Sequence, residues 1–150
     1  MTLDATQLLS MSQSQLDTLF KDSPAGPIPS GEAEGTAIVD PGTAISPIVA
    51  KFVHIFAWKG KVFDPSRGIL RNRILPDGEQ AVVAKVYLAP SLLDGKNCIV
   101  LDYSSTSLIA HWIRDEIREV GTNLYLGIVY WDHDKLINFA LDFTRSGSDA

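Results

Sequence analysis

The chain has 150 residues and a mass of 16.4 kDa, which is the size of a single domain. Apolar residues make up 45% of it and charged residues 21%, a balance that is typical of a globular protein with one buried core. This composition excludes wholesale disorder and a protein embedded in a membrane.

The formal net charge of −5 lies entirely in the first quarter of the chain. Residues 1–40 hold six acidic side chains and one basic side chain, Lys21, whereas the remaining residues hold twelve of each kind. An electroneutral body behind an acidic leader argues against general nucleic-acid binding, because a basic face supplies most of that affinity. We therefore expect no nucleic-acid partner.

The N-terminal segment predicts a short amphipathic helix followed by a lead-in across the surface. Ser12 and Gln15 have the spacing of a capping box, and Asp4 with Gln7 offers a weaker second start. Three large apolar side chains then recur at helical spacing up to about Lys21, namely Leu16, Leu19 and Phe20. The next ten residues, 22–31, contain three prolines and two glycines, which excludes both a helix and a central strand there.

Two features of the sequence bear on the compartment. The chain opens without the basic region and the apolar region of an export signal. Its single cysteine, Cys98, lies in an apolar run, so no disulfide can form within the chain and we expect a buried, inert thiol. We expect a cytoplasmic protein with no membrane partner.

From residue 34 onward the sequence consists of short apolar runs separated by turn residues. Eight strands are predicted, approximately at Glu34–Val39, Trp58–Phe63, Ile69–Ile74, Glu79–Leu88, Asn97–Tyr103, Ile113–Val120, Leu124–Trp131 and Lys135–Phe143. Most connections are too short for a parallel crossover, which needs a dozen residues or more, so neighbouring strands must be antiparallel. Alternation is clearest in the last strand, where four apolar residues share one face: Ile137, Phe139, Leu141 and Phe143.

Two segments between the strands have helical patterns. An N-cap and a first-turn proline at residues 46–47 precede five apolar residues at helical spacing, which predicts a helix of about eleven residues that ends near Ala57. The segment Ser107–Val120 fits either one helix or a helical turn followed by a strand. We favour a helical turn up to Trp112 and then a strand, because the run that begins at Leu124 needs a partner.

Eight antiparallel strands of about seven residues are enough to close a barrel whose interior is filled or holds one small ligand. The segment Leu101-Asp102-Tyr103 is similar to the Thr-Asp-Tyr motif of lipocalins, with leucine in the threonine position, whereas Gly35-Thr36-Ala37 lacks the tryptophan of their first strand. Over about residues 34–143 the chain thus resembles the calycin, or lipocalin-like, barrels. The resemblance implies a mainly β fold, an antiparallel up-and-down eight-stranded barrel with a capping helix after strand one and a short N-terminal helix. We expect an N-terminal helix and lead-in over residues 1–33 and one barrel domain over 34–150, with the function left open.

The densest polar cluster lies in the strand predicted from Ile113. If this segment alternates as a strand, Asp115 shares a side with Ile113 and Ile117 and lies in the barrel or at its rim. Burial would disfavour the charged carboxylate and let it exchange a proton near neutral pH. The alternative is a solvated face laced with ion pairs. The catalytic candidates are Asp115, Glu116 and Tyr103, the last at a strand end where Ser and Thr side chains also favour a cap or turn.

The candidates for ligand binding are Asn72, Tyr103, Arg114, Asp115, His111 and Trp58. Asn72 lies between two apolar alternates on a predicted core face, where its amide needs hydrogen-bond partners in the protein or in a ligand. The aromatic residues supply apolar walls, for which ordinary core packing is the alternative role.

No metal or cofactor site is predicted. The three histidines, His54, His111 and His133, are far apart in the sequence and show no ligand spacing. No motif for a nucleophilic serine or a phosphate-binding loop is present either. We therefore expect no cofactor and no metal.

A basic cluster occupies residues 51–73, which hold six basic side chains and one acid, Asp64. The basic residues are Lys51, Lys59, Lys61, Arg67, Arg71 and Arg73. We interpret them as solvated, outward-facing strand residues, since lysine and arginine are rarely buried. The alternative is a binding site for an anionic ligand.

Three hypotheses for the function follow. The leading one is a cytoplasmic barrel that binds a small hydrophobic or amphipathic molecule in its interior. The second is an enzyme on the same barrel, a lyase, isomerase or cyclase that uses an interior carboxylate with tyrosine or arginine for acid/base chemistry. The third is a filled barrel that acts as a protein-interaction module. Whether the protein is an enzyme, and whether it forms a homodimer, is left open by the sequence.

Overall fold

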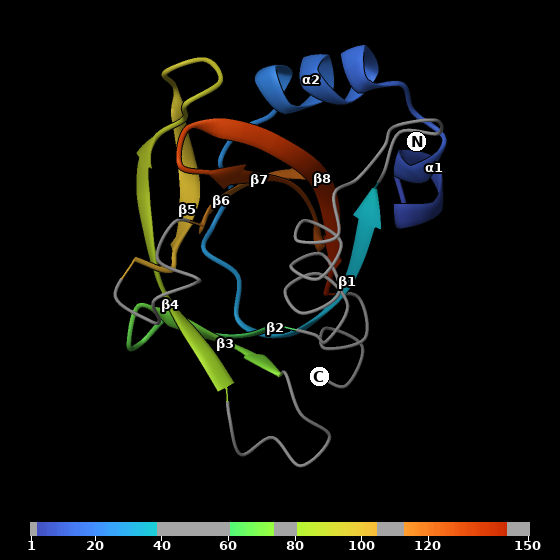
Figure 1. The fold of residues 1–150 in the computed structure, drawn as a ribbon. Helices are drawn as coiled ribbons and strands as arrows, with labels where there is room; N and C mark the ends of the chain where they lie inside the picture. The colour runs from blue at the N-terminus through green and yellow to red at the C-terminus, as the bar shows by residue number, and fades with distance from the viewer. Residues whose placement is uncertain (1–2, 39–60, 74–80, 105–112, 144–150) are drawn as a thin grey trace.

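The computed structural model describes residues 3–38, 61–73, 81–104 and 113–143. The strands in these residues close into one antiparallel barrel, in which each strand pairs with its neighbours in chain order and the first pairs with the last (Figure 1). They are β1 (Gly31–Ile38), β2 (Lys61–Asp64), β3 (Ile69–Arg73), β4 (Ala81–Pro90), β5 (Asn97–Asp102), β6 (Ile113–Gly121), β7 (Leu124–Trp131) and β8 (Asp134–Asp142). The predicted mainly β, eight-stranded up-and-down barrel is confirmed.

Two short helices precede the barrel, α1 (Ala5–Leu9) and α2 (Gln13–Asp22). Each begins with a complete capping box, formed by Asp4 with Gln7 and by Ser12 with Gln15. The helix predicted from Ser12 is confirmed, and Asp4, the weaker predicted start, begins a separate short helix. Within the described residues, no helix has both the length and the apolar character needed to cross a membrane.

The first of two apolar clusters lies in the barrel interior. Its members alternate along the strands, and it includes Ile113 and Ile117 of β6 and Phe139 and Leu141 of β8. The predicted alternation is confirmed, because Ile137, Phe139 and Leu141 of β8 and Phe143 directly after it all belong to this cluster. Gly127 of β7 lies directly opposite Phe139, and a Cβ at this glycine would lie 2.2 Å from the Phe139 ring. The absence of a side chain there makes room for the phenylalanine.

The second cluster lies outside the barrel, where α1 and α2 cover the outer face of β5, β7 and β8 (Figure 1). Leu8, Leu16 and Phe20 of the helices are buried there against outward residues of these strands. Cys98 belongs to this cluster and is fully buried, as predicted, and burial raises the pKa of its thiol to about 12. The acidic N-terminal segment is thus part of the folded body.

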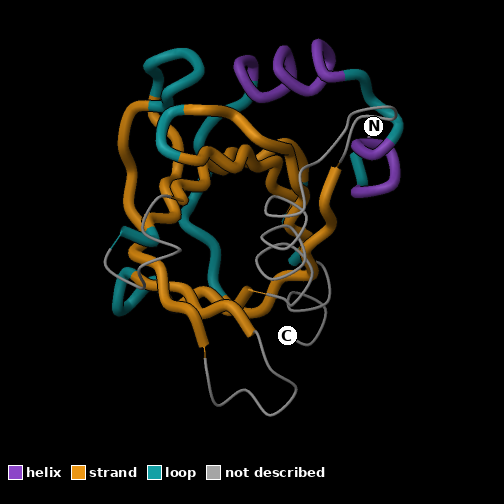
Figure 2. Tube along the Cα trace, viewed as in Figure 1, coloured by secondary structure: helices purple, strands orange, loops and turns teal. Residues whose placement is uncertain are grey.

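Residues 23–30 run from α2 to β1 across one end of the ring of strands (Figure 2). Ala25 and Ile28 pack against the interior cluster, and the Tyr125 hydroxyl donates a hydrogen bond of 2.6 Å to the Pro27 carbonyl. The proline and glycine content that excludes regular structure here leaves an extended segment that covers this end of the barrel.

The predicted strand positions agree with the structure within three residues wherever the structure describes the strand end. β7 has the predicted bounds, and β1 begins at Gly31, three residues earlier than predicted. β6 confirms the strand that we favoured after Trp112, although the helical turn before it lies outside the described residues. The helix predicted to end near Ala57 also lies outside them.

Candidate functional site

Three polar side chains from distant parts of the chain meet inside the apolar barrel. Lys61 is the first residue of β2, Tyr103 directly follows β5, and Asp115 is the third residue of β6. Each is at most 1% exposed. Asp115 occupies the same face of its strand as Ile113 and Ile117, which places its carboxylate in the interior as the alternation predicted. We call these three residues the interior polar group.

Lys61 is the centre of the interior polar group. Its Nζ donates a hydrogen bond of 2.9 Å to the Tyr103 hydroxyl and lies 3.9 Å from Oδ2 of Asp115. The ammonium also lies 5.9 Å from the centre of the Phe139 ring, within the range of a cation–π contact. One lysine therefore joins a phenol and a carboxylate in an apolar surrounding.

Both carboxylate oxygens of Asp115 are buried, and neither accepts a hydrogen bond within the part of the chain that the structure describes. The 3.9 Å separation from Lys61 allows charge attraction but exceeds the length of a hydrogen bond. A buried polar atom without a hydrogen bond is rare in native proteins and costs about 1 to 3 kcal/mol, more when it is charged. The Asp115 carboxylate is therefore an acceptor that can receive a donor from a bound molecule.

Burial and mutual attraction act in opposite directions on the two charged groups. Burial raises the pKa of Asp115 to about 7, although the nearby Lys61 ammonium favours the carboxylate. Burial lowers the pKa of Lys61 to about 8, although Asp115 favours its charged form. Both groups thus exchange protons near neutral pH, which is the range that acid/base chemistry needs.

The interior polar group lies away from the covered end of the barrel. Residues 23–30 lead into the start of β1, and Gly31 there pairs with Phe63 near the end of β2. Lys61 lies at the other end of β2, where β5 ends and β6 begins. The polar side chains therefore lie toward the end of the barrel opposite residues 23–30.

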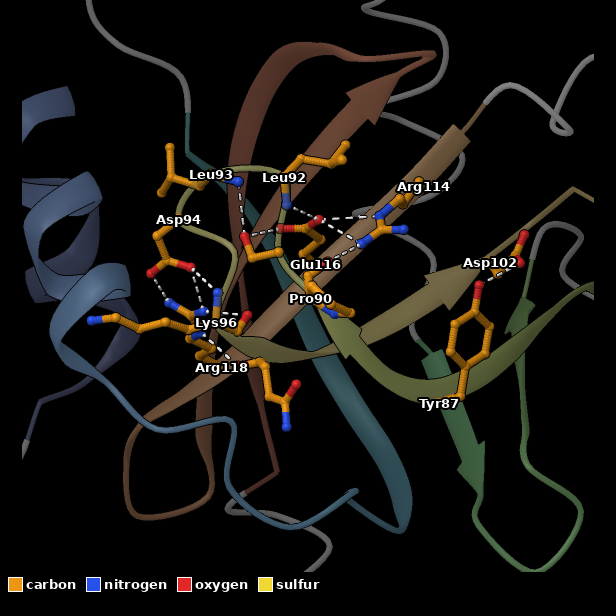
Figure 3. A network of polar contacts seen from close by, with 12 residues as sticks. Tyr87, Pro90, Leu92, Leu93, Asp94, Lys96, Asp102, Arg114, Glu116 and Arg118 are labelled. Atoms are coloured by element: carbon orange, nitrogen blue, oxygen red, sulfur yellow. Dashed lines mark hydrogen bonds and ion pairs between the residues drawn. The ribbon is translucent and has the colours of Figure 1, made fainter.

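The predicted candidates Arg114 and Glu116 do not join the interior polar group, because they lie on the opposite face of β6. Glu116 is fully buried outside the barrel, where its strand partners Val100 and Ile128 belong to the outer cluster. It accepts hydrogen bonds from the Ser91 hydroxyl, the Leu92 amide and the Arg114 guanidinium (Figure 3).

These contacts hold the connection between β4 and β5 against β6. Every described contact of Glu116 thus lies in that outer network, and nothing brings its carboxylate to the barrel interior. This arrangement corrects the expectation of a solvated face for this side of β6, since Glu116 is covered by its own network.

Arg118 extends the same face of β6 toward the helices and is 1% exposed. Its guanidinium donates two hydrogen bonds to the Asp94 carboxylate, of 2.7 and 2.8 Å (Figure 3). It also donates to the carbonyls of Phe20, Lys96 and Asn97 and lies over the Phe20 ring. This arginine thus ties the end of α2 to the β4–β5 connection, a structural role.

Three ligand-binding candidates fall outside what the structure describes. Trp58 and His111 lie in residues 39–60 and 105–112, and the side chain of Asn72 is also outside the described part. The backbone of Asn72 pairs with Lys61, which places it in the strand next to the interior polar group. Their roles stay predictions.

Lys61 is the functional candidate that the sequence did not identify, and its predicted outward position is wrong. Within the basic cluster, Arg67 and Arg71 are exposed as predicted, but Lys61 shares the inward face of β2 with Phe63. The signal was present, because this lysine lies two positions before a core phenylalanine, and residues two positions apart share a face of a strand. The usual exposure of lysine argued against it.

Asp102 has a structural role. Its carboxylate accepts hydrogen bonds from the Ser104 amide, at 2.8 Å, and from the Tyr87 hydroxyl, at 2.7 Å, outside the barrel. Of the motif Leu101-Asp102-Tyr103, only the tyrosine belongs to the interior polar group. Among the described residues, no group of His, Cys, Asp and Glu could hold a metal ion.

Comparisons with known proteins identify the fold and not a family. No protein-family model matches the chain, and no curated protein matches it significantly. The chain is similar to the crystal structure of a protein from Thermomonospora curvata, with a TM-score of 0.59 and 17% sequence identity. The match covers 93% of this chain and 98% of the other. At this identity the similarity shows a shared barrel fold alone.

Proposed function

We propose that this barrel binds a small, mostly apolar molecule in its interior, with the polar end of that molecule at Asp115, Lys61 and Tyr103. The observation that carries the proposal is the buried carboxylate of Asp115, which accepts no hydrogen bond from the described residues. Apolar residues surround it, including Ile113 and Ile117 on its own strand. Such a combination of apolar walls and a few convergent polar groups is typical of small-molecule sites.

The energetics of burial favour a functional over a structural role for this pair of charges. Replacing a buried ion pair with apolar residues of similar volume is often neutral or stabilising, by about 1 to 4 kcal/mol. Lys61 and Asp115 do not even form a hydrogen bond with each other, so their contribution to stability is smaller still. A bound molecule that donates a hydrogen bond to Asp115 would explain why the protein buries Lys61 and Asp115.

The charges of the interior polar group also indicate the chemistry of the molecule. When Lys61 and Asp115 are both ionised, their charges cancel, so burying a charged molecule beside them would leave a net charge in an apolar interior. We therefore propose an uncharged molecule with an apolar body and at least one hydrogen-bond donor for Asp115. An up-and-down barrel order supports the further proposal that the chain is a calycin.

The test uses phenol and anisole, which share an apolar ring and differ in the hydroxyl donor. We expect phenol to bind the wild-type protein at least about tenfold more tightly than anisole, measured by NMR chemical-shift titration, because only phenol donates to Asp115. Asp115→Leu should remove this preference. Asp102→Leu, which removes a carboxylate from the outer face, should keep it. Equal affinities for phenol and anisole, or no binding of either, would contradict the proposal.

A further inference from the structure

We propose that Asp115 is a general base that removes a proton from the carbon next to a carbonyl, while Lys61 and Tyr103 donate hydrogen bonds to the carbonyl oxygen. This proposal rests on the interior binding function proposed above and names its substrate class, an uncharged and mostly apolar carbonyl compound with an acidic C–H bond. The roles follow from how the three groups differ in what they can donate and accept.

The Asp115 carboxylate has the properties of a base that acts on carbon. Neither of its oxygens is occupied by a donor from the described residues, so both lone-pair regions are open to a C–H proton. A carbon acid cannot solvate a carboxylate as water does, and burial among apolar side chains such as Ile113 and Ile117 keeps the base reactive. The raised pKa of Asp115, about 7, supports this role because a stronger base lowers the barrier to proton removal.

Lys61 and Tyr103 supply the complementary part of the site. Their donor atoms lie 2.9 Å apart, so one oxygen atom can approach both of them. The Lys61 ammonium lies 3.9 Å from Asp115, which leaves more than a hydrogen-bond length between the acid/base group and the donor pair. Donors fixed in an apolar site stabilise the negative charge that develops on oxygen during proton removal.

The chemical step balances without a cofactor. Asp115 takes the proton as the C–H bond breaks, and the electron pair of that bond forms the carbon–carbon double bond of an enolate. The π electrons of the carbonyl move to its oxygen, where Lys61 and Tyr103 stabilise the charge. Asp115 then returns the proton to the same carbon or, in a β,γ-unsaturated substrate, to the γ-carbon at the far end of that carbon–carbon double bond, which shifts into conjugation with the carbonyl. The outcomes are exchange or epimerisation in the first case and isomerisation in the second.

The experiment follows hydrogen–deuterium exchange of 2-indanone, an apolar ketone with acidic C–H bonds next to its carbonyl. In D2O, loss of its α-proton NMR signal reports proton removal from carbon directly. We expect the wild-type protein to accelerate exchange about 100-fold or more over the same buffer, the range that a positioned general base supplies. The rate should rise as pH passes through about 7, because Asp115 must be ionised to act.

Three variants assign the roles. Asp115→Asn should return the exchange rate to that of buffer, and Tyr103→Phe and Lys61→Met should each lower it by about tenfold or more through loss of a donor. Asp102→Asn makes the same chemical change as Asp115→Asn but lies outside the barrel, and should leave the rate unchanged. Far-UV circular dichroism and the dispersion of the NMR spectrum establish that each variant is folded.

The outcomes separate this inference from the binding function. If phenol binds with the expected preference but 2-indanone exchanges no faster than in buffer, the catalytic role is overturned and the binding function stands. Exchange that persists in folded Asp115→Asn also overturns the role of Asp115. If neither phenol nor anisole binds and no exchange is seen, the proposed binding function fails together with the inference.

Discussion

The Lys61 ammonium faces the Asp115 carboxylate across 3.9 Å inside a closed barrel, too far apart for a hydrogen bond between them. Each of the two groups is 1% exposed. Their placement needs two strands from opposite parts of the sequence, β2 and β6, to face each other across the interior.

The stability of the protein should depend on pH through Asp115. Its pKa in the folded protein, about 7, is above the value of 3.8 expected for the unfolded chain, so the proton favours the folded state. This contribution is fully present below about pH 4 and is lost as pH rises through 7. Urea denaturation should show wild type losing stability relative to Asp115→Asn between pH 4 and 7.

Measuring the stability at higher pH tests the burial of Lys61, the charge partner of Asp115. The pKa of Lys61 is lowered from 10.5 to about 8, so its contribution is present above pH 10.5 and lost as pH falls toward 8. The Tyr103 phenol also contacts Lys61, so the Tyr103→Phe protein serves as the background for this measurement. A pH-independent difference between wild type and Asp115→Asn would contradict the burial of the carboxylate.

Replacing both charges should stabilise the protein or leave it unchanged. We expect Lys61→Met combined with Asp115→Leu to be between neutral and about 4 kcal/mol more stable than wild type, since no buried charge has to be desolvated. Asp115→Leu alone should be less stable than the double variant, because it leaves the Lys61 amine buried without its opposite charge. Chemical denaturation of the two variants and wild type measures these differences. A double variant that is clearly less stable than wild type would show that the pair is structural.

Loss of Arg118 should destabilise the protein strongly. Arg118→Met removes two hydrogen bonds to Asp94 and leaves three backbone carbonyls without their donor, at a cost of about 3 to 5 kcal/mol. Arg118→Lys should be intermediate, because it keeps the charge but loses the planar fork. A loss of less than about 1 kcal/mol in urea denaturation of Arg118→Met would contradict the role given to this arginine.

The pairing of Asp94 with Arg118 should contribute to the stability of the folded protein in a way that acid removes. Hydrogen bonds from Arg118 lower the pKa of Asp94 from 3.8 to about 2. The stabilisation by this pair is therefore present above about pH 4 and lost as pH falls through 2. The contribution of the Arg118–Asp94 pair is thus lost as pH falls, whereas that of Asp115 is lost as pH rises. Urea denaturation of Arg118→Met and Asp115→Asn as a function of pH therefore distinguishes the two contributions.

Gly127→Ala should destabilise the barrel although alanine is a small residue. The added methyl group would lie 2.2 Å from the Phe139 ring, and this ring belongs to the interior cluster. Such overpacking costs about 1 to 3 kcal/mol. In thermal unfolding, the double variant Gly127→Ala with Phe139→Leu should lose less than the sum of the single variants. Additive losses would mean that the glycine and the ring do not compete for space.

The sequence was sufficient for the strands, because short-range patterns determine them. Alternation along β6 was enough to place Asp115 inward, and the spacing of Ser12 and Gln15 was enough to predict the start of α2. These predictions use only neighbours within a few residues, where backbone geometry fixes direction. They needed no knowledge of which strands pair.

The site itself could not be assembled from the sequence. Lys61 contacts Tyr103, 42 residues away, only because the barrel closes. Lysine is usually exposed, so the sequence predicted an outward position for Lys61. Glu116 was a candidate because a carboxylate next to arginines is typical of a catalytic site. Its carboxylate instead accepts a hydrogen bond from Ser91, in the connection between β4 and β5. Long-range packing decides these cases, and local patterns do not contain it.

The most direct test of the interior site is the titration of the Asp115 side-chain carboxyl by carbon-13 NMR in the folded protein. The chemical shift of that carbon reports the protonation state of this one group, and Asp115→Asn assigns the signal. We predict a midpoint near pH 7, because a buried carboxylate that accepts no hydrogen bond from the described residues is a weak acid. A midpoint near pH 4, the value of an exposed aspartate, would contradict the interior site and the functions proposed for it.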